Sequence, residues 1–199
     1  MKHLIESIIR ALDKTLSLDD DQKAITEYAL YNVLVTLAVV SGLTLVSLLL
    51  GLAPVAFTAL CSGAAFRWSM GGAHYSRPSW CILASIAGPI IMAGLASYAS
   101  QLSTFTAHTL LIGIILVLFV FASAIIYLYC PAETENNPLP ERRKPQLRRI
   151  SYATLIMWLA IMLYLLRLDH ISLLLASCLA LVRQLLSVTP VGFRMFLSI

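Results

Sequence analysis

A histidine and a cysteine lie seven residues apart in a polar stretch of an otherwise apolar chain. The stretch covers residues 67–81 and reads RWSMGGAHYSRPSWC, so it contains His74 and ends at Cys81. A cysteine attacks as its thiolate, and a neighbouring histidine can take the thiol proton. The pair therefore makes Cys81 a candidate nucleophile and His74 its candidate base.

The surroundings of this pair fit such chemistry. Pro78 suits the first position of a helix, which would place Cys81 in the first turn. There the helix dipole and Arg77 favour an anion, while two glycines free the loop that carries His74. From the residues alone a plainer interpretation stays open, because a cysteine at a helix start is most often a small core residue and a single loop histidine is usually solvated.

The composition identifies the solvent of the fold. Of the 199 residues, 59% are hydrophobic and 12% are charged, whereas soluble domains carry about 25% charged residues. The apolar runs are continuous rather than alternating, and they approach the roughly 20 residues that a spanning helix needs. The sequence predicts an all-α polytopic membrane protein that forms a single integral-membrane domain over residues 1–199.

We expect about six transmembrane helices. The apolar segments cover residues 24–50, 54–66, 81–99, 107–129, 150–166 and 171–188. Segment 54–66 is the weakest, since its 13 residues rise about 20 Å against a hydrocarbon core of about 30 Å. The polar stretches 67–80 and 131–149 are expected to be loops.

The N-terminal residues 1–22 are charged throughout and lack the continuous apolar core of a cleavable signal peptide. Apolar residues within 2–16 fall on one helical face, which is typical of an amphipathic helix on a membrane surface. A helix packed on the protein's own loops fits the pattern equally well. Residues 17–20 read as the start of the next helix, with acidic residues in its first turn.

The basic residues predict the orientation in the membrane. With six crossings and a cytosolic N-terminus, Arg167 is the basic residue that faces outward, and loops 67–80 and 131–149 and both termini lie in the cytosol. If segment 54–66 did not cross, the two central basic loops would move outside and the positive-inside bias would be lost.

The order Arg67, Gly71-Gly72, His74 and Cys81, in a small six-span protein, resembles the AgrB (accessory gene regulator B) family of bacterial membrane endopeptidases that process quorum-sensing peptide precursors. A second block, PAETENNPL at residues 131–139, is similar to the PADTxNKP-type loop of that family.

The chain departs from this second pattern at Glu133, where aspartate is usual, and at Asn137, where lysine is common. Together with Asn136, these two residues are candidate orienters of His74, although an Asn-Pro-rich loop is usually just a turn.

The resemblance implies a membrane-embedded cysteine endopeptidase that removes the C-terminal tail of an AgrD-like precursor through an acyl-enzyme thioester, so that a thiolactone or lactone ring can close. His74 and Cys81 match the catalytic pair, and Arg67, Gly71 and Gly72 match supporting positions. It further implies a homodimer in the bacterial cell membrane, without a cofactor, a metal or a nucleic-acid partner.

A basic cluster follows the second block and places five cations within eight residues. Its members are Arg142, Arg143, Lys144, Arg148 and Arg149. Such a cluster fixes topology and attracts anionic lipid at about 1 kcal/mol per charge. The resemblance adds a second role, binding of the acidic tail of the precursor, and the two roles are compatible.

The last apolar segment contains Arg183 and Gln184, which could line a polar cavity, although an arginine that snorkels to the headgroups is equally plausible. The remaining cysteines are expected to be packing residues, and the remaining loop histidines to lie near the opposite membrane face. These are Cys61, Cys130, Cys178, His108 and His170.

Two other classes of function compete with this interpretation. A metal-dependent intramembrane protease is disfavoured, because the chain has no HExxH motif and few acidic residues. A small peptide transporter or exporter without catalytic activity is the alternative, and inverted repeats would favour it, but no convincing internal repeat is present.

Overall fold

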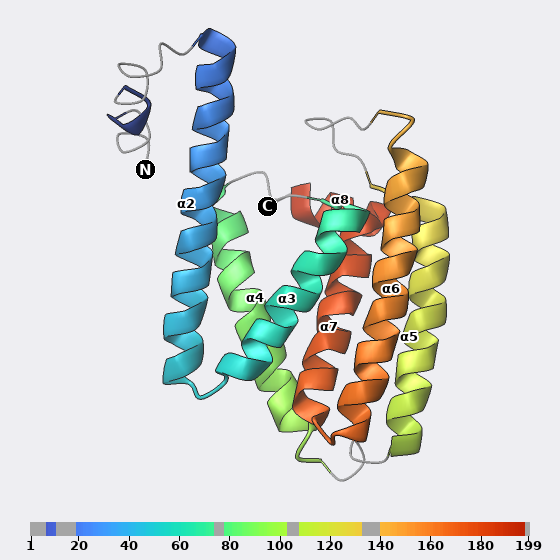
Figure 1. Cartoon of the computed structure of the whole chain (residues 1–199). Coiled ribbons are helices and arrows are strands. Elements are labelled where there is room, and N and C mark those ends of the chain that lie inside the picture. Colours follow the sequence, from blue (N-terminus) through green and yellow to red (C-terminus); the bar gives the residue numbers. More distant parts are fainter. Residues whose placement is uncertain (1–6, 11–18, 74–77, 103–107, 133–139, 198–199) are drawn as a thin grey trace. The chain divides into compact units, whose positions relative to one another are not determined.

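The computed structural model describes residues 7–10, 19–73, 78–102, 108–132 and 140–197. His74, Arg77 and the candidate orienters Glu133, Asn136 and Asn137 lie outside these residues. The described part is helical and contains no strand, which confirms the predicted all-α class (Figure 1). Its long helices are α2 (Asp20–Leu49), α3 (Ala53–Met70), α4 (Pro78–Ala99), α5 (His108–Tyr129), α6 (Lys144–Arg167) and α7 (Ile171–Val188), and the short α8 (Pro190–Leu197) follows them.

Among the described residues, five helices are long and apolar enough to cross a membrane: α2, α4, α5, α6 and α7. The protein is therefore a polytopic membrane protein, as predicted. Helix α3 does not meet the same criteria of composition, but its 18 residues rise about 27 Å, more than expected for segment 54–66. Pro54 stands at its start, where a missing N–H costs nothing.

The chain divides into two compact units, Met1–Gly42 and Leu43–Ile199. In the first unit, a reciprocal cap starts α2: the Gln22 amide donates to Asp19 Oδ1 at 2.7 Å, and the Asp19 amide donates to Gln22 Oε1 at 3.2 Å. The predicted helix start is thereby confirmed. Of the predicted amphipathic helix, only residues 7–10 are described, and they are helical.

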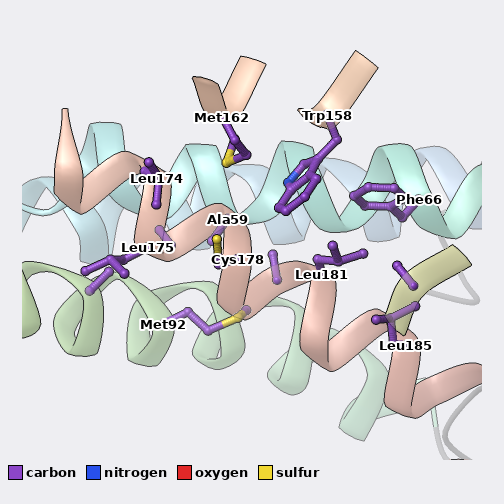
Figure 2. Close-up of a cluster of buried hydrophobic side chains, with 14 of the residues drawn as sticks. Ala59, Phe66, Met92, Trp158, Met162, Leu174, Leu175, Cys178, Leu181 and Leu185 are labelled. Atoms are coloured by element: carbon purple, nitrogen blue, oxygen red, sulfur yellow. The ribbon is translucent and has the colours of Figure 1, made fainter. Parts of the chain in front are cut away.

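Helix α7 is the central element of the second unit. In α7, 67% of the apolar membrane-spanning stretch is buried inside the protein, compared with 28% in α5 and in α6. It packs against α3, α4, α5 and α6. Figure 2 shows Leu181 of α7 beside Phe66 of α3 and Trp158 of α6, whose rings meet edge to face at 6.4 Å between centroids. Residues on α7 can therefore set the relative placement of several helices.

Polar contacts inside this core are few and paired. Ser177 of α7 accepts a hydrogen bond from Trp158 Nε1 at 2.9 Å, and its hydroxyl lies 2.8 Å from that of Ser62 on α3. Within apolar surroundings such bonds are retained because an unpaired polar group costs free energy. This trio joins α3, α6 and α7 near the middle of the bundle.

Two helix boundaries differ from the sequence-based prediction, and one further helix is present. Helix α3 continues to Met70, so Arg67 lies in its last turn rather than in a loop. Helix α6 begins at Lys144, with Pro145 in its first turn, and this shortens the predicted loop 131–149. Helix α8 was not predicted, and it turns so sharply after α7 that Gly192 has no room for a Cβ beside the Leu186 carbonyl.

Candidate functional site

The two blocks that carry the resemblance meet at one end of the second unit. The end of α3, the start of α4, the end of α5 and the end of α7 all lie at this end (Figure 1). The Ala132 amide donates to the Met70 carbonyl at 2.9 Å, and Gly71 and Ala132 form an isolated parallel bridge. Residues 71 and 132, far apart in the sequence, are thus paired through their backbones.

Cys81 is the fourth residue of α4 and lies in its first turn, as predicted from Pro78. Its side chain is partly exposed. Backbone N–H groups of a first turn lack intrahelical acceptors and favour a nearby anion. Cys81 is therefore partly exposed and lies at a helix start.

The chain just before His74 is held firmly. Ala73 is buried, its amide donates to the Ser187 carbonyl at 2.9 Å, and its own carbonyl accepts a hydrogen bond from Arg67 Nη2 at 2.9 Å. Residues 74–77 then lead to Pro78, where α4 begins. The predicted base therefore follows an anchored residue and precedes the helix that carries Cys81.

The two glycines serve close packing rather than the loop freedom expected from the sequence. Gly71 has φ +72° and Gly72 has φ +127°, conformations that L side chains rarely adopt. A Cβ at Gly71 would lie 2.5 Å from the Ala132 carbonyl oxygen, and one at Gly72 would lie 2.7 Å from Ser187 Oγ. Glycine is required at both positions for conformation and for space.

Helix α7 supplies contacts to this segment that the sequence did not reveal. Gln184 is buried and donates from Nε2 to the Gly71 carbonyl at 2.8 Å, and Ser187 contacts Gly72 and Ala73. An amide inside an apolar helix is the signal that pointed to Gln184. Ser187 carries no comparable signal, since serine occurs in many helices.

Arg183 faces α4. Its Nη2 donates to the Ala84 carbonyl at 3.2 Å, and its Nη1 lies 2.8 Å from the position that a Cβ of Gly88 would take. The guanidinium therefore packs on a neighbouring helix. This helix-to-helix contact was not expected from the sequence.

The basic cluster lies on and just before the first turns of α6. Lys144 pairs with Glu141 at 2.5 Å, and Arg148 donates from Nε to the Cys130 carbonyl at 2.9 Å. Three further members, Arg142, Arg143 and Arg149, are exposed. Cations in the first turn of a helix oppose its dipole, at a cost of about 0.3–1 kcal/mol each.

No role in the chemistry is assigned to Cys61, Cys130, Cys178 or His108, all of which the structure describes. Burial raises the pKa of the Cys130 thiol to about 12, although the Arg148 charge lowers it somewhat. Cys178 is buried in α7, whereas Cys61 is exposed on α3. At the opposite end of the unit, His108 Nε2 lies 3.0 Å from Asp169 Oδ1.

Comparisons with known proteins support the family resemblance that the two paired blocks carry. A family model described as "Accessory gene regulator B" matches residues 5–188. "Putative AgrB-like protein" of Clostridium perfringens (strain SM101 / Type A) is 26% identical over 162 residues, which cover 81% of this chain and 75% of that protein. "Putative AgrB-like protein 2" of strain 13 / Type A is 25% identical over 164 residues, with the same coverage. No solved structure matches.

Proposed function

Because the chain belongs to the AgrB family, we propose that it is a membrane-embedded cysteine endopeptidase of the agr quorum-sensing system, with Cys81 as nucleophile and His74 as base. The observation that carries the proposal is the position of Cys81, accessible in the first turn of α4 and four residues beyond the loop that the anchored Ala73 begins. The substrate proposed is an AgrD-like precursor peptide with an acidic C-terminal tail.

The first step is acyl transfer to sulfur. His74 takes the thiol proton, and the Cys81 thiolate attacks the carbonyl carbon that joins the core of the precursor to its tail. The resulting tetrahedral intermediate collapses, the carbon–nitrogen bond breaks, and His74 returns the proton to the leaving amine. The tail departs, and the core stays on Cys81 as a thioester.

The second step closes the ring. A thiol or hydroxyl of the precursor core attacks the Cys81 thioester, and the Cys81 sulfur leaves and regains a proton. Exchange of one thioester for another is nearly isoenergetic, so departure of the tail must help to drive the first step. Water must be kept from the intermediate, because hydrolysis would give a linear product.

The charge distribution supports a cytosolic location of this site. In the second unit, the described basic residues at the end that carries the two blocks are Arg67, Arg142, Arg143, Lys144, Arg148, Arg149 and Arg194. Arg167 stands at the opposite end. By the positive-inside rule the catalytic end faces the cytosol, where a newly made precursor would be encountered.

The exposed arginines provide a binding surface for the acidic tail. Arg142, Arg143 and Arg149 are exposed beside the start of α6, at the end of the unit that contains Cys81. Opposite charge draws a ligand to a surface before chemistry begins. Tail binding there would present the peptide bond before the tail to the first turn of α4.

The experiment that tests this function uses the purified full chain in liposomes with an AgrD-like precursor that has an acidic tail. Cleavage without other components is expected, and it should survive chelators but be lost on thiol alkylation or in Cys81→Ala. Movement of intact precursor across the membrane without cleavage would instead show the exporter.

A further inference from the structure

We propose that Arg183 and Gln184 of α7 are positioning residues that hold the two halves of the catalytic segment in register, the loop that leads to His74 and the helix that carries Cys81. The inference rests on the proposed function, because the relative position of the loop and the helix matters only if His74 and Cys81 react together. Neither residue is argued to contact the substrate.

Gln184 holds the loop. It is 5% exposed, and its Nε2 donates to the carbonyl of Gly71, which itself pairs with Ala132. A buried side-chain amide needs a partner, and here the partner is the backbone three residues before His74. Ser187, three residues further along α7, binds the Ala73 amide through its carbonyl. One turn of α7 therefore fixes residues 71–73.

Arg183 holds the helix. Its guanidinium binds the Ala84 carbonyl and packs over Gly88, where a Cβ would lie 2.8 Å from Nη1. Positions 81, 84 and 88 follow one another at spacings of three and four and share a face of α4. The guanidinium thus lies against the face that carries Cys81, one to two turns further into the helix.

The two contacts start from adjacent residues of the most buried helix of the second unit. Successive residues of an α-helix point about 100° apart, so Arg183 and Gln184 can address different neighbours, α4 and the loop. One turn of α7 therefore contacts both residues 71–73, which precede His74 in the chain, and the helix that carries Cys81. A displacement of about 1 Å in such a site can cost roughly 100-fold in rate.

The test compares Gln184→Leu and Arg183→Met with a matched control, Ser177→Ala. Ser177 lies on the same helix, seven residues before Gln184. Its replacement removes interhelical hydrogen bonds to Ser62 and Trp158, neither of which belongs to the catalytic segment. We expect kcat for precursor cleavage to fall roughly 10- to 100-fold in both test variants while KM changes less than about threefold. Arg183→Lys should recover part of the loss, and Ser177→Ala should stay within about threefold of the parent kcat.

A second readout separates positioning from general stability. In a variant whose remaining cysteine is Cys81, the rate of its alkylation by N-ethylmaleimide is measured with and without His74→Ala. Gln184→Leu should slow alkylation when His74 is present and have no further effect in the His74→Ala background. If Gln184→Leu does not insert, Gln184→Met, which keeps an unbranched side chain without a donor, takes its place.

The results assign failure to one claim or the other. Additive effects of Gln184→Leu and His74→Ala, or an equal fall in kcat in Ser177→Ala, would overturn the positioning role. If Cys81→Ala is inactive but Gln184→Leu and Arg183→Met keep the parent kcat, this inference alone is wrong. If Cys81→Ala cleaves normally, the proposed function itself is wrong.

Discussion

Arg148 donates a hydrogen bond of 2.9 Å from Nε to the carbonyl oxygen of Cys130. Arg148 lies on α6, and Cys130 directly follows α5, so the bond joins the two helices two residues before Ala132, which pairs with Gly71. One member of the basic cluster is therefore part of the support beneath the candidate site. Three other members, Arg142, Arg143 and Arg149, are exposed.

Arg148→Gln should differ from substitutions at its neighbours. Loss of the hydrogen bond from the charged guanidinium to the Cys130 carbonyl should lower the free energy of unfolding. The loss should be only about 1 kcal/mol, because the side chain is largely exposed. Cleavage should show a lower kcat with its salt dependence retained. Thermal unfolding in detergent and cleavage kinetics check both points, and a variant with raised KM and parent kcat would contradict the supporting role.

Neutralising the exposed arginines Arg142, Arg143 and Arg149 to glutamine should raise KM and leave kcat nearly unchanged, since the acidic tail is captured before chemistry begins. High salt should mimic the effect in the parent protein, because the Debye length falls from about 8 Å at physiological ionic strength to about 3 Å at 1 M.

The same charges also hold the loop on its side of the membrane, so orientation must be confirmed by labelling a cysteine placed in the loop. A correctly oriented variant with unchanged KM at low salt would leave the cluster as a topology signal alone.

Gly72→Ala should abolish cleavage while the protein still inserts. Its φ of +127° and the 2.7 Å separation of a new Cβ from Ser187 Oγ would force the loop before His74 to move. Gly63→Ala, on α3 with nothing within 4 Å of a new Cβ, is the matched control and should keep parent activity. Kinetics of both variants in liposomes provide the measurement, and equal activities would show that the loop tolerates displacement.

Cys130 should react slowly with alkylating agents. Burial raises its thiol pKa from 9.0 to about 12, so it stays neutral at physiological pH. In single-cysteine variants we expect alkylation of Cys130 to be at least about tenfold slower than that of Cys81, because the thiolate is the reactive form. Equal rates would show that Cys130 is exposed or ionised.

The same shift has a consequence for stability. The unfolded chain loses the Cys130 proton near pH 9.0, whereas the folded chain keeps it until about pH 12. The contribution of this thiol is therefore fully present below pH 9 and is lost as pH rises towards 12. Unfolding followed from pH 8 to 11 should show a smaller alkaline loss in Cys130→Ala than in the parent.

The sequence predicted most helices because continuous apolar runs and start signals are local. Segments 107–129 and 171–188 agree with α5 and α7 to within a residue, and Pro78 begins α4. Boundaries failed where polar residues continue a helix, at Arg67 on α3 and at Lys144 on α6. Hydrophobicity alone cannot show where a helix continues through polar residues.

The candidate site was predictable only in its chemistry. The residue types of Cys81 and the paired glycines were visible in the sequence, and so was the intramembrane polarity of Gln184. The bond from Gln184 to Gly71 and the pairing of Gly71 with Ala132 were not, because they join residues 113 and 61 positions apart. Such contacts depend on how the helices pack.

The most direct test of the central claim is precursor cleavage in liposomes by two variants measured side by side. One is Cys81→Ala, and the other retains Cys81 while Cys61, Cys130 and Cys178 are replaced by alanine. We predict no cleavage by the first and appreciable cleavage by the second, because the thiolate of Cys81 forms the acyl-enzyme. Cleavage by a correctly inserted Cys81→Ala protein at the parent rate would contradict the account.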